Sequence, residues 1–398
     1  MKATITVGEE RLVSARGTII PQAANLGDGR ILARYSVGID AWFEPSGASL
    51  STDAGKTWHE TECPLHRSES IGELGDGHVM MLDQHLFKTE SCAEDQFVMI
   101  CSETRDGGDI WSAPRLIHFE VPDVLVTHYR PAPSGDPRAF YELPIPESYH
   151  PFIGSHEAFV GGHVFGRIIR LPDSALGVTA YCQLSENMKH QTGMDESDYL
   201  PPKSPDAGVA DEGHDDVLFS AVFFRSEDEG QHWTAAGTVG QMAPGEPFDG
   251  GMLYSEGFTE TGVTRTSDGR LYALMRHGSY MLLWRNSSSD GGRTWDDMMC
   301  FNYPGVAPSL CLMPNGIMAA AWGRPGMSVA FSLDGTGRTW DAIAGIMQDD
   351  QPSQKYPWLH PLDEKRLLLF YDRRVWDASV HNYTEHGIYC REITISPT

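Results

Sequence analysis

The stretch Ser288-Ser289-Asp290-Gly291-Gly292-Arg293-Thr294-Trp295 decides the fold, because its pattern returns four more times along the chain. A second clear copy runs from Ser51 to Trp58, and looser copies run from Thr104 to Trp111, from Ser226 to Trp233 and from Ser332 to Trp340. A short apolar run that is typical of a β-strand precedes each copy. The pattern therefore predicts a turn that closes a hairpin, repeated along an array of similar units.

Turn chemistry explains why these residue types recur. Ser and Asp side chains accept hydrogen bonds from nearby backbone amides, Gly adopts a positive φ, and the Trp ring packs across the hairpin. The pattern resembles the Asp-box, or BNR, repeat of the sialidase superfamily. In that family the boxes are structural, so we assign no chemistry to them.

A second marker indicates the other turn of each unit. Asp or Asn, followed mostly by Gly, lies between two apolar runs, which is a strong signal for a two-residue hairpin turn. The six copies are Asp28-Gly29, Asp76-Gly77, Asp173-Ser174, Asp268-Gly269, Asn315-Gly316 and Asp363-Glu364. Neighbouring copies lie either about 48 residues apart, the length of a four-stranded propeller blade, or about twice that.

These spacings predict an all-β protein, a six-bladed β-propeller with four-stranded antiparallel blades. We expect one domain over residues 1–398, with insertions at about 112–162 and 184–216. The first insertion carries neither marker, so a degenerate seventh blade is the alternative there. The sixth unit has no Asp box, and the N-terminal run Ala3 to Val7 is expected to supply its outer strand and close the ring.

Composition narrows the class of partner. A formal charge of −25 argues against nucleic acid and anionic membranes, whose binding needs clustered Lys and Arg. The first ten residues lack the apolar segment of a signal peptide, and no apolar run is long enough to span a bilayer. We therefore expect a cytoplasmic protein, or a secreted one if a leader has been removed. The oligomeric state is left open.

The predicted topology places candidate side chains on one face. Strand direction alternates within a blade, so the starts of the first strands and the loops between the second and third strands share a face, opposite the two turn markers. Convergent polar groups at the mouth of a propeller favour a sugar site. The candidates there include Gln22, Asp40, His85, Glu260, Arg276, His277, Arg324, Tyr356 and Arg373.

The resemblance to the sialidase superfamily gives roles to five of these residues. It implies that Asp40 is the general acid, Tyr356 the nucleophile and Glu260 its partner. It also implies that Arg276 and Arg324 hold the substrate carboxylate. The family's third arginine belongs to an Arg-Ile-Pro pattern in the first blade, which here reads Ile19-Ile20-Pro21. The resemblance is strong for the fold and partial for the site.

We therefore expect an exo-acting glycoside hydrolase that cleaves a terminal, acidic sugar with retention. A tyrosine has an ordinary pKa of about 10 and needs a neighbouring base, which Glu260 would be. His85, His277, Arg373 and Gln22 are further candidates for binding substrate. Two alternatives remain, a polysaccharide lyase acting on uronic acids and a non-catalytic carbohydrate-binding propeller. No cofactor is expected, with a structural calcium at acidic residues 211–216 as the alternative.

Overall fold

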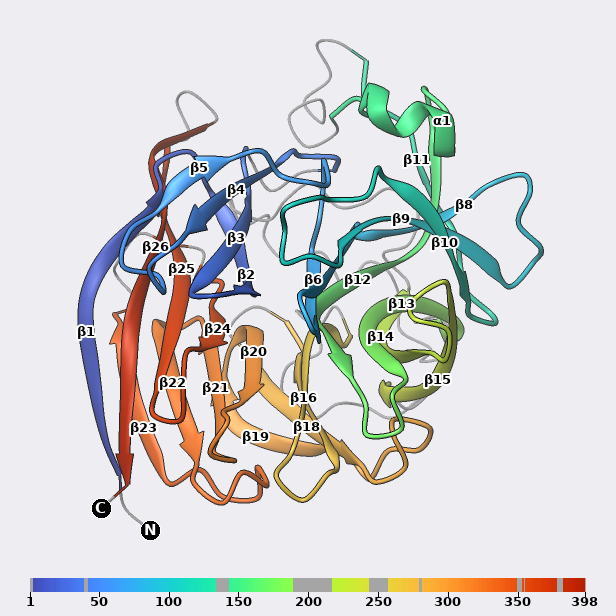
Figure 1. Ribbon diagram of the computed structural model, residues 1–398. Helices are drawn as coiled ribbons and strands as arrows, with labels where there is room; N and C mark the ends of the chain where they lie inside the picture. The colour runs from blue at the N-terminus through green and yellow to red at the C-terminus, as the bar shows by residue number, and fades with distance from the viewer. Residues whose placement is uncertain are drawn as a thin grey trace.

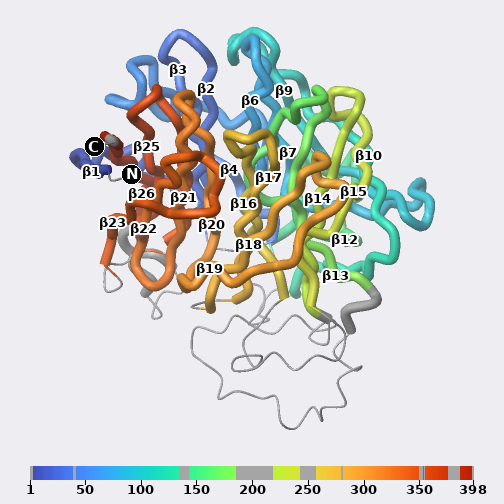
Figure 2. Tube along the Cα trace, turned by 90° about the horizontal axis from the view of Figure 1, so that it is seen from below, coloured from blue at the N-terminus to red at the C-terminus, as the bar shows by residue number. Residues whose placement is uncertain are grey.

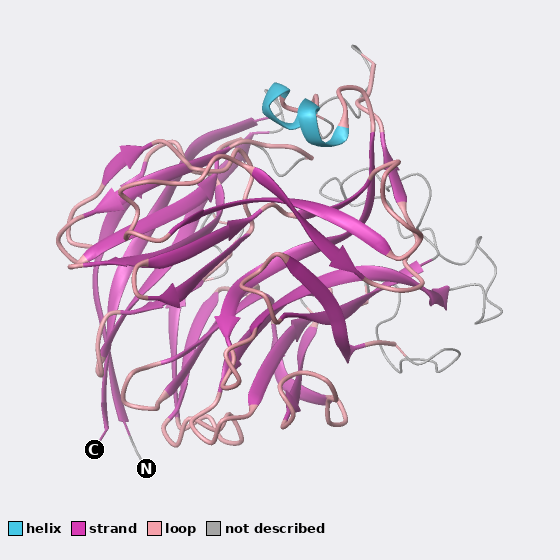
Figure 3. Ribbon diagram, turned by 45° about the vertical axis from the view of Figure 1, so that its right-hand side comes forward, coloured by secondary structure: helices cyan, strands magenta, loops and turns pink. Residues whose placement is uncertain are grey.

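The computed structural model describes residues 3–38, 42–133, 143–188, 217–242, 257–278, 281–348, 353, 355–377 and 382–397. Nearly all regular structure in these ranges is β-strand (Figure 3). The helical elements described are η2 (Glu147–Tyr149) and α1 (His150–Ile153). Among the described residues, no helix has the length and hydrophobicity needed to cross a bilayer.

The described strands fall into six successive groups along the chain, which we call units. Four of them, the first, fourth, fifth and sixth, are separate four-stranded sheets. The first unit contains β2 (Ile19–Gly27), β3 (Arg30–Ser36), β4 (Ser46–Ser51) and β5 (His59–Thr61). The fourth contains β16 (Thr259–Arg265), β17 (Leu271–Arg276), β18 (Leu282–Ser288) and β19 (Met299–Pro304). The fifth contains β20 (Val306–Leu312), β21 (Met318–Gly323), β22 (Met327–Ser332) and β23 (Ala342–Met347).

The second and third units join into one ten-stranded sheet. The second contains β6 (Ser70–Gly75), β7 (His78–Leu82), β9 (Gln96–Thr104) and β10 (Arg115–Glu120). The third contains β12 (Ala158–Arg170), β13 (Leu176–Met188), β14 (Val217–Ser226) and β15 (His232–Gly240). The two are joined by parallel pairing of β10 with β15 and of β12 with β6, and by an added strand, β8 (His85–Lys88), which pairs with β12.

The sixth unit combines the two ends of the chain. It contains β24 (Trp358–Pro361), β25 (Arg366–Asp377), β26 (Asn382–Pro397) and β1 (Ala3–Ser14). Strand β1 pairs antiparallel with β26 from Ala3 opposite Pro397 onward, so the N-terminal run does supply the outer strand of this sheet. Figures 1 and 2 show both termini side by side next to these strands.

The first strands of the six units, β2, β6, β12, β16, β20 and β24, lie toward the middle of the molecule (Figure 1). Each contacts the next in chain order, and β24 also contacts β2. The starts of these inner strands therefore lie close together in space, although they are far apart in the sequence.

The predicted turns form as expected. In the box at Ser51 the Asp53 carboxylate accepts hydrogen bonds from the backbone N–H and the hydroxyl of Thr57, at 2.8 and 2.7 Å. The Ser51 hydroxyl accepts the backbone N–H of Gly55, which has a φ of 82°. Asp290 and Thr294 repeat this arrangement. The hydroxyl of Thr57 lowers the pKa of Asp53 to about 2. The outer strands of the five box units follow their boxes.

The first insertion differs from the prediction. Its start, at residues 115–120, is β10, the outer strand of the second unit. The rest includes β11 (Thr127–Tyr129), which pairs with the beginning of β12, followed by η2 and α1. The described residues of this insertion form no separate four-stranded sheet. In the second insertion β13 extends to Met188, and residues 189–216 lie outside the described ranges.

Candidate functional site

Tyr356, Glu260 and Arg276 meet at the starts of two inner strands. The Tyr356 hydroxyl donates to Oε1 of Glu260 at 2.7 Å, and the Arg276 guanidinium donates to the same oxygen at 2.5 Å. Glu260 lies on β16, Arg276 ends the neighbouring strand β17, and Tyr356 precedes β24. All three residues are 6 or 7% exposed. The structure thus brings together three of the residues that the sequence predicted as a site.

Glu260 owes its position to an irregular start of β16. Its φ is 39°, in the left-handed region that non-glycine residues rarely occupy, and the pairing with β17 shifts register between Thr259 and Gly262. A bulge of this kind re-aims a side chain and is common beside active sites. Ile20 and Ala307 have the same positive φ and register shift at the starts of β2 and β20. Glu has no local preference for this conformation, so the bulge was missed from the sequence.

Arg324 lies above the same group. It follows β21, in the loop between the second and third strands of its unit, as predicted. Its guanidinium lies over the Tyr356 ring, 5.4 Å from the ring centroid. The site therefore places two guanidinium groups and one carboxylate around one phenol.

The position of the family's third arginine is apolar. Ile19 has no exposed surface and belongs to a cluster that includes Ile20, Phe165, Ala307 and Tyr356. Arg34, on the neighbouring strand, is also fully buried and donates to the carbonyl oxygen of Ile20 at 2.7 Å. Burial lowers the pKa of Arg34. This guanidinium stabilises the backbone of the bulge instead of replacing the missing arginine.

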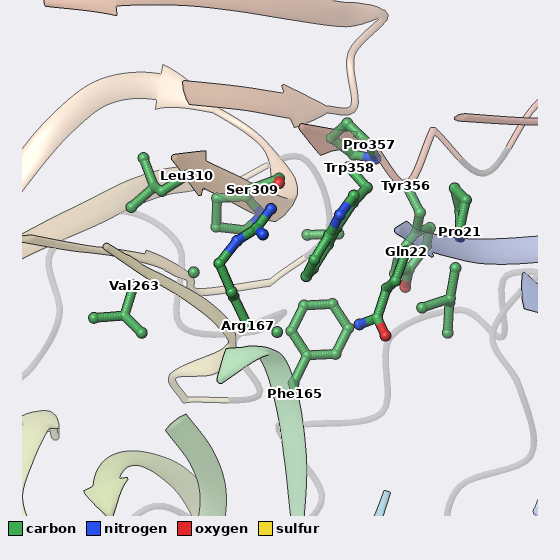
Figure 4. Close-up of a pocket in the computed structure, with 15 residues that line it drawn as sticks. Pro21, Gln22, Phe165, Arg167, Val263, Ser309, Leu310, Tyr356, Pro357 and Trp358 are labelled. Carbon is green, nitrogen blue, oxygen red and sulfur yellow. The ribbon is translucent and has the colours of Figure 1, made fainter. Parts of the chain in front are cut away.

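A narrow cavity of about 10 Å³, roughly the room that one water needs, lies between the inner strands beside Tyr356. Figure 4 shows Gln22 beside Tyr356, and Arg167 beside the ring of Trp358. The guanidinium of Arg167 lies 4.5 Å from that ring centroid and donates to the carbonyl of Leu359 at 2.5 Å. The Gln22 amide donates to the carbonyl of Glu69 at 2.6 Å. Gln22 thus lines this inner cavity, and its hydrogen bond links β2 to the residue that precedes β6.

Three other predicted binding residues have described contacts with partners other than Tyr356, Glu260 and Arg276. Arg373 contacts Glu10 at 3.1 Å and lies over the Tyr389 ring, toward the outer strands of its sheet. His277 packs against Phe258, with ring centroids 4.9 Å apart, and burial lowers its pKa to about 4. His85, on β8, packs against Trp42 of the first unit. The predicted acid, Asp40, and the acidic residues 211–216 lie outside the described residues.

A buried polar group in the second unit was missed from the sequence. Arg67 donates to Glu69 Oε1 at 3.1 Å and to the side-chain oxygen of Gln84. The Tyr149 hydroxyl, from the insertion, donates to Asp83, whose carboxyl has its pKa raised by burial. Arg67, Glu69, Asp83 and Tyr149 are all under 5% exposed. These contacts attach the insertion to the second unit.

The described residues include no group of three or more His, Cys, Asp or Glu side chains arranged to hold a metal ion.

Residues 204–367 match the family model described as a BNR repeat-like domain. A search of curated proteins found no match. Similar solved structures include a protein of unknown function from Dyadobacter fermentans, with a TM-score of 0.63 and 15% identity over 98% of this chain and 99% of that chain. The Hadza microbial sialidase Hz136 has a TM-score of 0.58 and 15% identity over 94% of this chain and 65% of the sialidase.

The α-L-arabinanase of Penicillium chrysogenum, solved with arabinobiose, has a TM-score of 0.55 and 12% identity, over 97% of this chain and 98% of that enzyme. At these identities the likeness shows the fold. The chain therefore has the fold of these neighbours and carries a BNR repeat-like domain within it.

Proposed function

We propose that this chain, which has the BNR-repeat fold of the sialidase superfamily, is an exo-acting glycoside hydrolase that cleaves a terminal acidic sugar with retention. The observation that carries the proposal is the 2.7 Å hydrogen bond from the Tyr356 hydroxyl to Glu260, beneath Arg324. A phenol paired with a carboxylate base is an activated nucleophile.

In the first step the Tyr356 oxygen attacks the anomeric carbon while Glu260 accepts the phenol proton. Asp40, assigned from the family resemblance, protonates the leaving oxygen, and the bond to the leaving group breaks. In the second step water attacks the glycosyl–tyrosine, Asp40 takes the proton of that water, and Glu260 returns a proton to Tyr356. Two displacements at one carbon retain its configuration.

An acidic sugar suits this group of residues. Arg276 and Arg324 carry planar forks that bind carboxylates, and a neutral phenol approaches an anionic substrate with less repulsion than a carboxylate would. The buried Ile19 leaves two arginines where the family has three. Loss of one charge-assisted contact costs about 1.5–3 kcal/mol. We therefore leave the identity of the acid open and do not restrict it to sialic acid.

The proposed architecture is one six-bladed propeller over residues 1–398. Its support is the cyclic order of contacts among the inner strands, from β2 through β24 and back to β2, together with the pairing of β1 with β26.

Replacing Tyr356 with Phe tests the function. We would measure release of the aryl group from sialosides and uronides, with Tyr303→Phe on exposed strand β19 as the matched control. Turnover should fall at least about a hundredfold in the first variant and stay unchanged in the second. Unchanged turnover in Tyr356→Phe would remove this residue from the mechanism.

A non-catalytic carbohydrate-binding role is the second candidate. The low exposure of Glu260, Tyr356 and Arg276 and the apolar Ile19 position favour it. Binding of acidic glycans by the parent chain, without product by mass spectrometry over a long incubation, would support this reading. A lyase would need a histidine in contact with Tyr356; the described ring contacts of His85 and His277 are with Trp42 and Phe258, and those of His163 reach Tyr181.

A further inference from the structure

The inner strand of the sixth unit starts differently from those of three other units. In the first, fourth and fifth units the inner strand also pairs with the second strand on the N-terminal side of its bulge, at Ile19–Ser36, Thr259–Arg276 and Val306–Gly323. In the sixth unit the described pairing of β24 with β25 begins at Trp358, opposite Phe370. Continuing this register by two residues would place Tyr356 opposite Asp372.

The carboxylate of Asp372 contacts the segment that leads into Tyr356. Its Oδ1 accepts the backbone N–H of Tyr356 at 3.1 Å, and its Oδ2 accepts the hydroxyl of Ser353 at 3.2 Å. The Ser353 hydroxyl in turn accepts the backbone N–H of Lys355 at 2.7 Å. Asp372 therefore holds this segment at two points, with a side chain in place of a main-chain acceptor.

Burial makes Asp372 a firm support. The side chain has no exposed surface, so water does not compete for its oxygens. A buried carboxylate is costly unless it is paired and hydrogen-bonded. Here the hydrogen bonds from Tyr356 and Ser353 are joined by the guanidinium of Arg374, whose Nε lies 3.9 Å from Oδ2.

The fifth unit packs against the same segment. A methyl group at Gly323, the last residue of β21, would overlap the carbonyl oxygen of Lys355. Lys355 itself has a left-handed φ of 62° and is 4% exposed. The segment before Tyr356 is thus confined by backbone contact with one unit and by the Asp372 carboxylate of another.

The position of this segment decides where the phenol lies. The Tyr356 hydroxyl meets Glu260 of the fourth unit at 2.7 Å, so a small shift of the Tyr356 backbone would separate the two groups. Reacting groups are sensitive to such shifts, because a misplacement of about 1 Å can cost about a hundredfold in rate.

We propose that Asp372 is a positioning residue for the proposed nucleophile, because it holds the Tyr356 backbone where the phenol meets Glu260. The inference rests on the proposed function for the role of Tyr356. Asp372 acts through Ser353 and the Tyr356 backbone and makes no contact with the substrate.

The test compares two variants on the aryl glycoside that the parent cleaves. Asp372→Leu removes both acceptor oxygens, and Asp372→Asn keeps an oxygen that accepts the Tyr356 N–H. We expect kcat to fall about a hundredfold in the first and to stay within about fivefold of the parent in the second. KM should stay within about threefold in both, because the arginines that hold the sugar remain.

A Leu variant with the kcat of the parent, or with a change in KM alone, would overturn the positioning role. So would an Asn variant that is as slow as the Leu variant, because it keeps the hydrogen bond to Tyr356.

Ser353→Ala covers the case in which Asp372→Leu does not fold, because it leaves Asp372 beside Arg374. It breaks the link from Asp372 to the Lys355 N–H, so kcat should fall about tenfold at unchanged KM. Ser332→Ala is the matched control, since the Ser332 hydroxyl also donates to an Asp, at 2.9 Å, and accepts a backbone N–H, at 3.1 Å, within an Asp box. Equal kcat in the two Ala variants would overturn the role.

If the parent cleaves no substrate, the proposed function fails and the positioning role is tested by structure. Crystal structures of the parent and of Asp372→Leu or Ser353→Ala give the distance from the Tyr356 hydroxyl to Oε1 of Glu260. Lengthening beyond about 3.5 Å in the variant supports the role, and an unchanged hydrogen bond overturns it.

Discussion

The backbone N–H of Ala307 donates to Oε2 of Glu260 at 2.9 Å, across the boundary between two sheets. Both residues have a left-handed φ, 45° and 39°, at equivalent positions of neighbouring inner strands. The other carboxylate oxygen accepts the hydrogen bonds from Tyr356 and Arg276. Three donors from three units therefore fix the orientation of the proposed base.

Replacing Glu260 with Gln should lower kcat by about 10²–10⁴, because the amide keeps the shape of the side chain and cannot accept the phenol proton. Replacing it with Ala should also lower the free energy of unfolding by about 3–5 kcal/mol, since this removes one partner of a buried ion pair. Steady-state kinetics and denaturant titration measure the two effects. A Gln variant with the parent's kcat would contradict the role of Glu260 as base.

Replacing Arg324 with Ala should weaken binding of the acidic sugar specifically. A charge-assisted contact contributes about 1.5–3 kcal/mol, so KM for the acid should rise about 10- to 150-fold. The methyl ester of the same substrate lacks the charge and is the control, and its KM should change little. If acid and ester lose affinity equally, Arg324 does not bind the carboxylate.

Asp53 should make the stability of its hairpin depend on pH in the acid range. The Thr57 hydroxyl lowers the pKa of Asp53 to about 2, against about 3.9 in an unfolded chain. Its contribution is therefore present above pH 4 and is lost as the pH falls toward 2. The melting temperatures of the parent and Asp53→Asn should differ at pH 5 and converge near pH 2. An equal difference in melting temperature at pH 5 and at pH 2 would contradict this role of Asp53.

His277 should also lower stability as the pH falls, but in a higher pH range, because protonation places a charge on a buried imidazole. Burial lowers its pKa to about 4, and the unfolded value is about 6.5. The unfolded chain therefore binds more protons between these values. This destabilises the fold by up to about 3 kcal/mol as the pH falls from 6.5 to 4. His277→Phe should flatten that slope in denaturant titrations. His118→Phe should leave it in place, and an unchanged slope in His277→Phe would refute the assignment.

Local turn chemistry made much of the fold predictable. The boxes and the Asp-Gly turns are each determined by a few adjacent residues, and the structure forms them between the expected strands. Glu260, Arg276, Arg324 and Tyr356 could be placed together because each lies at a strand start or end that the turns locate. The extra strand β8 was missed, because residues 85–88 follow a short loop and pair with β12, far along the chain.

Side-chain direction was harder to predict than position. Arg373 and Arg374 are adjacent on β25 and point to opposite faces of the sheet, and the first reaches Glu10 while the second is 4% exposed. Strand register decides which of the two arginines points to which face of the sheet. The sequence around two consecutive arginines does not reveal that register. The positive φ of Glu260 is similar, since packing between neighbouring units imposes it.

The antiparallel pairing of β1 with β26 has a mechanical consequence. Because Ala3 lies opposite Pro397, these two ends of the paired strands lie at the same end of the sheet. Tension applied between those ends would break the backbone hydrogen bonds between β1 and β26 one after another. In a shear geometry, by contrast, all of these bonds would be loaded at the same time. The pairing of β1 with β26 should therefore separate at low force, before the inner strands near Glu260 and Tyr356 unfold.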